Sequence, residues 1–329
     1  MKAVLCEELG TPDTLVIRDI ADPQPGPGEV RIAVEACGVN FPDTLIIEGK
    51  YQMKPDLPFS PGGEVAGIIE AVGEGVEAAR IGEPVIAMTG FGGFAEKLCV
   101  AENLLFPRPA DMPGRVAAGF AMVYGTSMHA LKQRAELKPG ETLLVLGAGG
   151  GVGLAAVEIG KLMGARVIAA ASSEEKLAAA KAAGADDLIN YTETPLREAL
   201  AELVGKKGVD VVYDPVGGAL FEQALRSTAW RGRVLVVGFA SGDIPKVPIN
   251  LALLKGCSIV GVFWGSFRQR ELALDNENFA QLFDWYGAGK LKPLVSQAYP
   301  LDAAPQALAD LAGRRAIGKI VLTTDLGAA

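Results

Sequence analysis

The first 120 residues carry the hydrophobic and polar pattern of β-strands. Residues 29–39 (EVRIAVEACGV) and 64–73 (EVAGIIEAVG) alternate apolar and polar side chains, and residues 84–88 (PVIAM) form a short apolar run. Each segment is bounded by Gly, Pro or Asp, which favour turns. This part of the chain is therefore predicted to be β-rich.

From about residue 115 the pattern changes to short apolar strands separated by helix-forming segments. The strand at 142–147 (TLLVLG) precedes a helical segment at 151–164, and the strand at 165–171 (ARVIAAA) precedes another at 172–184. Further apolar runs follow in DLINY, VDVVYDPVGG, RVLVVG and SIVGVFW. Buried strands that alternate with helices predict a doubly wound parallel sheet with both faces covered.

These two patterns predict an α/β chain with two domains. Residues 1–120 form the first part of a β-rich catalytic domain, and residues 121–262 form the parallel-sheet domain. Residues 263–329 add helices and the terminal strand KIVLTTD, which is expected to return to the first domain.

The strongest local signal is a glycine-rich turn between the strand at 142–147 and the next helix. Its residues are Ala148, Gly149, Gly150, Gly151, Val152 and Gly153. They fit AxGxxG rather than GxGxxG. Gly150 would let the backbone approach a pyrophosphate, Gly153 would let helix and strand pack closely, and the helix N-terminus offers amides to phosphates. This context predicts a dinucleotide site, with a merely tight turn as the alternative.

The end of the second strand indicates which dinucleotide binds. An Asp or Glu about 20 residues after the glycines would bind the ribose hydroxyls of NAD, but Ala171 stands there. Ser172, Ser173 and Lys176 are suited to receive a 2′-phosphate, so NADPH is predicted. In the alternative interpretation Ser172 and Glu175 form a capping box and Lys176 is only solvated.

Charge and composition narrow the possible partners. The formal net charge of −8 disfavours nucleic acid. The chain lacks an apolar run of about 18 residues that would cross a membrane, and its N-terminus lacks a secretory signal, so a cytoplasmic location is expected. His129 is the only histidine and the four cysteines form no CxxC pair, so no metal site is expected.

With these residues assembled, the chain resembles the zinc-independent, zeta-crystallin-like quinone oxidoreductase branch of the medium-chain dehydrogenase/reductase superfamily. The resemblance covers essentially the whole chain. Its markers are ACGVNFPDTLIIEGKY, LPFSPGGEVAGIIEAVGEGV, the glycine turn, LINY, VDVVYDPVGG, GFASG and GVFWG. It implies a GroES-like β-rich catalytic domain formed from both chain ends around a Rossmann domain. It also implies a cleft between them for nicotinamide and substrate, and usually a homodimer.

The resemblance also bears on zinc. Zinc alcohol dehydrogenases of this superfamily carry Cys where this chain has Asn40, and His where it has Gly63. Their structural cysteine cluster has no counterpart here. Because a catalytic zinc needs about three protein ligands, the resemblance implies zinc-free chemistry.

Three catalytic candidates follow from the resemblance. Tyr51 matches a tyrosine that donates a hydrogen bond or proton in related enoyl thioester reductases, Asn40 an asparagine at the former zinc position, and Thr126 a threonine near the nicotinamide. The alternatives are a surface aromatic for Tyr51, a turn cap for Asn40 and a helix residue bonded to a carbonyl for Thr126. Asp43 is expected to orient Asn40 or the loop, and Asp214 to serve its local turn.

Further cofactor contacts are implied beyond the glycine turn. They are Tyr191 near the adenosine phosphate, Gly238 and Phe239 in GFASG, and Phe263 and Trp264 in GVFWG. The two aromatic side chains of GVFWG have plain core packing as their alternative.

The leading prediction is an NADPH-dependent reductase of quinones, enones or other activated alkenes. Without zinc, preorganised donors must stabilise charge on the substrate oxygen. Leu45 replaces a second tyrosine found in some quinone reductases, which makes one pocket wall less polar. An enoyl or acryloyl thioester (CoA) reductase is a second interpretation, with Arg268 and Arg270, or Arg314 and Arg315, as a basic rim. A third is an NADPH-binding structural or regulatory protein with little turnover.

Overall fold

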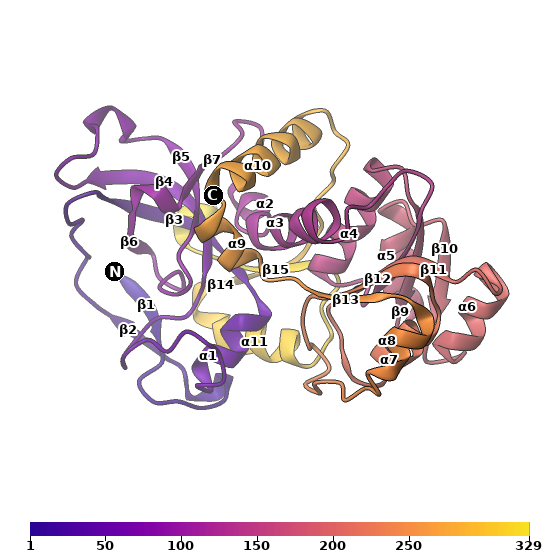
Figure 1. Ribbon diagram of the computed structural model, residues 1–329. Helices are drawn as coiled ribbons and strands as arrows, with labels where there is room; N and C mark the ends of the chain where they lie inside the picture. Colours follow the sequence, from indigo (N-terminus) through magenta and orange to yellow (C-terminus); the bar gives the residue numbers. More distant parts are fainter. Residues whose placement is uncertain (329) are drawn as a thin grey trace. The chain divides into compact units, whose positions relative to one another are not determined.

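The computed structural model describes residues 1–328, and their contacts divide the chain into two compact units (Figure 1). Unit 1 comprises Met1–Met122 and Pro293–Ala329, and unit 2 comprises Val123–Lys292. Both chain ends therefore contribute to unit 1. Among the described residues, no helix combines the length and apolar character needed to cross a membrane.

Unit 1 is built, within residues 1–328, on a seven-stranded sheet. The order is β14-β15-β3-β4-β5-β7, with β6 also paired to β3, and β1 and β2 form a separate pair. The strands are β1 (Lys2–Leu5), β2 (Val16–Asp19), β3 (Glu29–Val39), β4 (Glu64–Val72), β5 (Pro84–Met88), β6 (Lys97–Ala101), β7 (Leu105–Pro107), β14 (Val295–Pro300) and β15 (Lys319–Thr323). The helices are α1 (Phe41–Ile47), α2 (Gly114–Ala117), α11 (Ala304–Ala312) and α12 (Asp325–Ala328).

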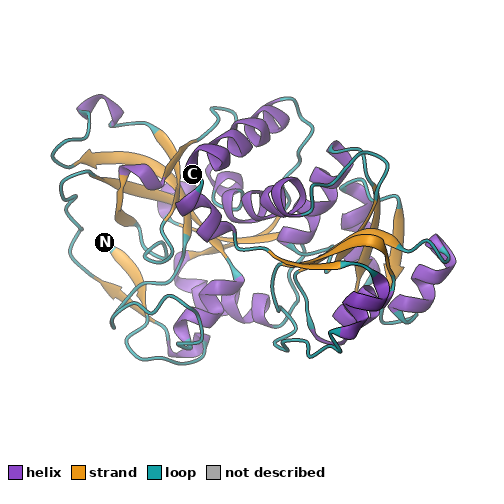
Figure 2. Ribbon diagram, viewed as in Figure 1, coloured by secondary structure: helices purple, strands orange, loops and turns teal. Residues whose placement is uncertain are grey.

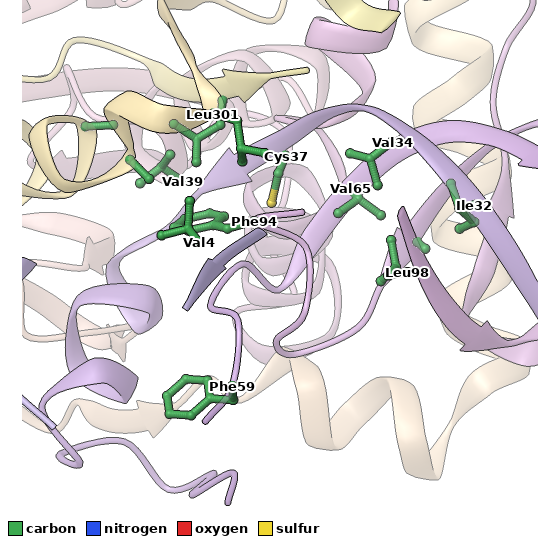
Figure 3. Close-up of a cluster of buried hydrophobic side chains, with 14 of the residues drawn as sticks. Val4, Ile32, Val34, Cys37, Val39, Phe59, Val65, Phe94, Leu98 and Leu301 are labelled. Carbon is green, nitrogen blue, oxygen red and sulfur yellow. The ribbon is translucent and has the colours of Figure 1, made fainter. Parts of the chain in front are cut away.

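Strand β3 organises this unit because it pairs with β4, β6 and β15. Its side chains alternate between buried and half-buried positions as far as Glu35, as an amphipathic strand requires. Figure 3 shows Ile32, Val34, Cys37 and Val39 of this strand in the buried hydrophobic cluster of unit 1. The predicted strands at 29–39, 64–73 and 84–88 are confirmed as β3, β4 and β5.

Unit 2 contains, among the described residues, a six-stranded parallel sheet. Its order is β10-β9-β8-β11-β12-β13. The strands are β8 (Thr142–Leu146), β9 (Arg166–Ala171), β10 (Asp187–Asn190), β11 (Val209–Asp214), β12 (Thr228–Val236) and β13 (Ser258–Gly261). Every residue of β8 is buried, because helices cover both faces of such a sheet. The predicted α/β class is thereby confirmed.

The helices of unit 2 are α3 (Ala121–Met128), which begins at the boundary of the unit, the π-helix at His129–Arg134, α4 (Gly151–Leu162), α5 (Glu174–Ala182), α6 (Leu196–Val204), α7 (Gly218–Arg226), α8 (Asn250–Lys255), α9 (Trp264–Arg270) and α10 (Leu272–Gly287). Helices α4 to α8 each connect two successive strands of the sheet, whereas α3 and the π-helix precede its first strand and α9 and α10 follow its last. Figure 2 shows these helices in purple and the strands in orange.

The second boundary differs from the division expected at residue 263. Residues 263–292 belong to unit 2, and the chain returns to unit 1 only at Pro293. The reason lies in the packing of α9 and α10. The Trp264 ring packs against Gly125, where a Cβ would lie 2.6 Å from the ring, and Asn278 exchanges hydrogen bonds with Gln133 at 3.0 and 3.2 Å.

Candidate active site

The glycine turn of unit 2 is shaped by close contact between β8 and α4. A Cβ on Gly153 would lie 2.3 Å from the carbonyl oxygen of Gly147 and 2.8 Å from Cα of Ala148, so a side chain there would displace backbone. A Cβ on Gly150 would meet only the Gly147 oxygen, at 3.5 Å. Gly153 therefore serves the fold, whereas Gly150 leaves the turn open to a ligand.

This turn lies at the point where the sheet changes direction. Strand β8 pairs with β9 on one side and with β11 on the other, and the chain moves outward from β8 on both sides. Gly150 is the N-cap of α4 and stands directly before its first residue, Gly151. The helix N-terminus and the carboxyl ends of parallel strands together form the usual place for a dinucleotide pyrophosphate.

Ser172, Ser173 and Lys176 lie beside the glycine turn. Ser173, rather than Ser172, is the N-cap of α5, and its hydroxyl accepts a hydrogen bond from the Lys176 backbone amide at 3.4 Å. The Lys176 ammonium donates to the Ser172 hydroxyl at 3.3 Å. A Cβ on Gly149 would lie 2.5 Å from Cβ of Lys176. The lysine stem therefore rests against the turn, and a hydroxyl and an ammonium stand next to the predicted pyrophosphate position.

Tyr191 follows β10 and is tied to the same place. Asn190 is paired with Ala171 in the sheet, and the Tyr191 amide donates to the Ala171 carbonyl at 3.2 Å. The side chain is partly buried against the core of unit 2. The structure thus brings together the glycine turn, the end of β9 and Tyr191.

Ser127 was missed by sequence reasoning although it contacts the cofactor turn. Its buried hydroxyl donates to the Val152 carbonyl at 3.0 Å and pairs with the Tyr213 hydroxyl at 2.9 Å. Helix α3 is thereby fixed to the start of α4 and to β11. Thr126, the predicted neighbour of the nicotinamide, is half-buried on the same helix. A lone Ser in YGTSMHAL gives no sequence signal for this contact.

The remaining predicted contacts of unit 2 differ in their surroundings. Gly238 donates its amide to the Asp214 carbonyl at 3.4 Å, and the Phe239 ring lies against Gly217. Phe263 is 59% exposed, whereas Trp264 is 5% exposed. The Trp264 indole donates to the Asp275 carboxylate at 2.8 Å, so this ring has the surroundings of a core aromatic.

Two other side chains of unit 2 serve the fold. The Asp214 carboxylate accepts from the amides of Val216 and Gly217 at 2.7 and 2.9 Å, which confirms its predicted turn role. Arg268 is buried and donates to Asp275 at 2.8 Å. The expectation that Arg268 contributes to a basic rim is therefore wrong, because its guanidinium faces a buried carboxylate.

In unit 1, Asn40 stands between β3 and α1, where Asp43 fixes the backbone. The backbone N–H groups of Asn40 and Gly62 donate to the Asp43 carboxylate at 2.7 and 3.3 Å. The backbone N–H of Asp43 donates to the backbone carbonyl of Asn40 at 2.9 Å. Desolvation by burial raises the pKa of Asp43 to about 7, against the opposing effect of the backbone amides and Lys319.

The Asn40 side chain belongs to a buried network with two charged residues. The Lys319 ammonium donates to the Asn40 side-chain oxygen at 2.7 Å. The Asn40 side-chain nitrogen donates to the Glu64 carboxylate at 3.0 Å and to the Gly38 carbonyl at 3.3 Å. Lys319 and Glu64 also form an ion pair at 3.3 Å. Neither charged residue was identified from the sequence.

Tyr51 lies beyond α1 and packs partly buried against the core cluster of unit 1. Burial, followed by the charge of Asp43, raises the pKa of its phenol above the usual value. The phenol therefore keeps its proton near neutral pH and is able to donate a hydrogen bond.

The side chains around Asn40 do not match the donor set of a zinc site. A Cβ on Gly63 would lie 3.0 Å from the Gly90 carbonyl oxygen, which leaves little room for a larger side chain. Burial raises the pKa of the Cys37 thiol well above its usual value. Within the part of the chain that the structure describes, three or more His, Cys, Asp or Glu side chains nowhere gather as a metal site would need.

Two protein-family models match the chain. An alcohol dehydrogenase GroES-like domain covers residues 26–110, and a zinc-binding dehydrogenase model covers residues 151–284. The quinone oxidoreductase-like protein 2 of Bos taurus is 39% identical over 323 residues, with 98% of this chain and 92% of the relative covered. The quinone oxidoreductase of Homo sapiens is 35% identical over 325 residues, with 98% and 97% covered.

Solved structures of a quinone oxidoreductase and of an NADPH-bound protein are also similar to this chain over nearly its whole length. Quinone oxidoreductase from Escherichia coli complexed with NADPH aligns with a TM-score of 0.91 at 30% identity, covering 98% of this chain and 100% of that one. A mycobacterial protein complexed with NADPH aligns with a TM-score of 0.92 at 36% identity, with the same coverage.

Proposed function

This chain belongs to the quinone oxidoreductase branch of the medium-chain dehydrogenase/reductase superfamily, and we propose that it reduces a quinone or another conjugated carbonyl without zinc. The observation that carries the proposal is the buried network of Asn40, Glu64 and Lys319. It places an ammonium 2.7 Å from the side-chain oxygen of the residue that replaces a zinc ligand.

The chain is an NADPH-dependent oxidoreductase, as its named relatives and the NADPH-bound neighbours indicate. We assign the pyrophosphate to the turn at 148–153, whose glycines leave room for it. Ser172 and Lys176 would hold a 2′-phosphate beside that turn. When bound, NADPH supplies the hydride. The role of unit 2 is to bind and orient it.

The residues of unit 1 would act on the acceptor. Hydride addition to a conjugated carbonyl leaves negative charge on the carbonyl oxygen, and preorganised donors stabilise that charge. The protonated Tyr51 phenol is the assigned donor, and its proton completes the reduced product. The Asn40 side-chain nitrogen is the second donor, with Asp43 holding its backbone.

A zinc ion does not fit this arrangement, although one matching family model is described as a zinc-binding dehydrogenase. The Asn40 oxygen and the Glu64 carboxylate are both occupied by the Lys319 ammonium. A Cβ on Gly63 would make a tight contact of 3.0 Å with the Gly90 carbonyl oxygen, so a histidine has little room at this position. A zinc ion placed here would compete with the Lys319 ammonium, which is already paired, and within residues 1–328 no three His, Cys, Asp or Glu side chains gather to ligate one.

We propose that the functional form is a homodimer joined through unit 2. Strand β13 is an edge strand of the described sheet, and α8, directly before it, exposes Leu253 by 80% and Leu254 by 71%. Gly256 lies between α8 and β13, and the exposed Trp230 ring packs over this glycine. An edge strand beside exposed apolar side chains suits pairing with a second copy.

Light scattering tests the dimer. Leu254→Glu is expected to halve the molar mass in solution, because a charge would lie in the interface. Leu188→Glu, on β10 at the other edge of the sheet, is the matched control and is expected to keep the dimer. A wild-type chain with the mass of one copy would overturn the dimer proposal.

The reaction is tested by the loss of NADPH absorbance with a quinone, a simple enone and a crotonyl thioester offered side by side. NADH serves as the control for cofactor choice. Turnover of quinone or enone that prefers NADPH supports the proposal. Turnover of the thioester alone would favour an acyl thioester reductase. Tight NADPH binding without turnover of any acceptor would contradict the proposal and favour a regulatory protein.

A further inference from the structure

The orientation of the Asn40 side-chain amide is fixed by one cation, Lys319, and one anion, Glu64. Its oxygen accepts from Lys319 at 2.7 Å, and its nitrogen donates to Glu64 at 3.0 Å. If the amide were turned over, its N–H groups would face the ammonium and its oxygen would face the carboxylate. Both contacts would be repulsive, so only the observed orientation is stable.

The two hydrogen bonds made by the Asn40 nitrogen are unequal. The bond to the Glu64 carboxylate is 3.0 Å long and charge-assisted, whereas the bond to the Gly38 carbonyl is 3.3 Å long. The N–H directed at Gly38 is therefore the more weakly held of the two. It is the donor that exchanges most easily for a substrate oxygen.

We propose that Lys319 is a positioning residue for the reduction. It holds the Asn40 side-chain amide so that the N–H now bonded to the Gly38 carbonyl can be exchanged to a substrate oxygen. The inference rests on the proposed function. It extends that function to a residue of the C-terminal strand that need not touch the substrate, the cofactor or the reacting atoms.

The fold holds Lys319 firmly in this place. It begins β15, where the next residue, Ile320, pairs with Val39 at the end of β3. The ammonium also donates to the Val39 carbonyl at 3.1 Å. A Cβ on Gly119 would lie 3.3–3.4 Å from three carbons of the lysine stem, so this glycine leaves room for the stem to pass. The side chain is buried along its length.

Glu64 completes the arrangement from the other side. One carboxylate oxygen accepts from the Met122 amide at 2.8 Å, and the other faces both Asn40 and Lys319. Removal of Lys319 alone would leave this carboxylate buried without its cation and would destabilise the protein for that reason. A test of positioning must therefore remove both charges together.

The decisive variant is the double substitution Lys319→Met with Glu64→Gln, which leaves no unpaired charge. We expect a melting temperature like that of the wild type, because no buried charge is left unpaired. We also expect unchanged NADPH affinity, because the assigned cofactor residues belong to unit 2. We expect kcat to fall about 10²-fold, the loss that a displacement of about 1 Å can cause when a mutation shifts a group in the site. Lys207→Met, an exposed lysine of unit 2, is the matched control and should leave kcat unchanged.

Lys319→Arg separates positioning from simple support of the fold. It keeps a charge and donors at the same place, so kcat should lie between the wild type and the double variant, with the KM for NADPH unchanged. This comparison with the wild type stands even if the double variant does not fold. A folded Lys319→Arg variant whose kcat falls by the full amount of about 10²-fold, although a charge and donors remain at this place, would then overturn the inference.

Other outcomes are equally distinct. A folded double variant with wild-type kcat would overturn the inference and leave the proposed function intact. Loss of kcat in Lys319→Met that the added Glu64→Gln restores would also overturn it, because the cause would be the unpaired carboxylate. A wild-type chain with no turnover of any acceptor would overturn the proposed function, and the inference with it.

Discussion

The candidate sites of the two units are constructed in opposite ways. In unit 2 the cofactor turn is one stretch of six residues, and what matters is the absence of side chains at Gly150 and Gly153. In unit 1 the network consists of side chains, with Lys319 separated from Asn40 by 279 positions along the chain. Unit 2 therefore supplies backbone and space, and unit 1 supplies buried charge.

This difference determines how each site should fail. A backbone site is damaged by adding atoms, and the damage affects ligand binding. A network of buried charges is damaged by removing one partner, because the remaining charge is then buried without compensation and destabilises the protein. Substitutions in unit 2 should therefore change NADPH affinity, whereas substitutions in unit 1 should change kcat.

The largest effect is expected from added atoms in the cofactor turn. Gly153→Ala forces the backbone of the turn to move, so NADPH affinity should fall at least about 10²-fold and the melting temperature should drop. Gly150→Ala has room within the protein and should weaken NADPH binding with little change in melting temperature. Fluorescence titration and thermal unfolding measure both, with Gly287→Ala in α10 as a neutral control. Wild-type affinity in Gly150→Ala would mean that the pyrophosphate does not approach this glycine.

Next comes the phenol of unit 1. Tyr51→Phe should lower kcat for an enone about 10²-fold, because a general acid contributes at least that much. The Kd for NADPH should stay within twofold of wild type, because Tyr51 belongs to unit 1 and the assigned cofactor residues belong to unit 2. Initial rates at saturating NADPH check this. Quinone reduction that is indifferent to the substitution would remove Tyr51 from the donor role.

Lys176→Ala should give a smaller effect in unit 2. The lysine lies against Gly149 and bonds Ser172, so its loss removes one charge-assisted contact to the predicted 2′-phosphate. NADPH binding should weaken about tenfold, while NADH binding, which lacks that phosphate, should not change. Equal losses for both cofactors would place the 2′-phosphate elsewhere.

The smallest effects are opposite pH dependences of stability. Burial raises the pKa of Asp43 to about 7 in the folded chain, against about 3.9 unfolded. Between these values the folded state holds the extra proton, so the stability of unit 1 should fall as pH rises, by at most about 1.4 kcal/mol per pH unit. In unit 2, burial lowers the pKa of His129 to about 4, against about 6.5 unfolded. Here the unfolded state holds the extra proton, so stability should rise with pH.

Urea unfolding between pH 4.5 and 6.5 tests the two slopes. Asp43→Asn should remove the falling contribution and His129→Gln the rising one, so the two variants should shift the wild-type slope in opposite directions. Shifts of the same sign would show that one of the two side chains titrates differently in the folded chain.

Much of the fold was predictable because its signals are local. The strands at 29–39 and 84–88 match β3 and β5 residue by residue, since β3 alternates buried and half-buried side chains over most of its length and β5 is a short apolar run buried on both faces. The glycine turn was predictable for the same reason, because all six residues are contiguous. The N-cap of α5 was predictable only to within one residue, because Ser172 and Ser173 are both suited to that position. In the structure Ser173 is the N-cap.

The unit 1 network was not predictable from local patterns. In the sequence, Lys319 and Glu64 each look like the polar first residue of an ordinary strand. Only the pairing of β15 and β4 with β3 brings both to Asn40. Similarly, residues 263–292 looked like part of the terminal segment, because the contact between Trp264 and Gly125 depends on tertiary packing.

The role of the unit 1 network is tested by the kcat of Asn40→Ala at saturating NADPH, with NADPH affinity determined on the same sample. We expect kcat to fall about 10²-fold, as when one donor to a developing oxyanion is lost, while NADPH affinity stays within twofold of wild type. A kcat within twofold of wild type would contradict this role, because the amide held by Lys319 and Glu64 would then have no part in the reaction.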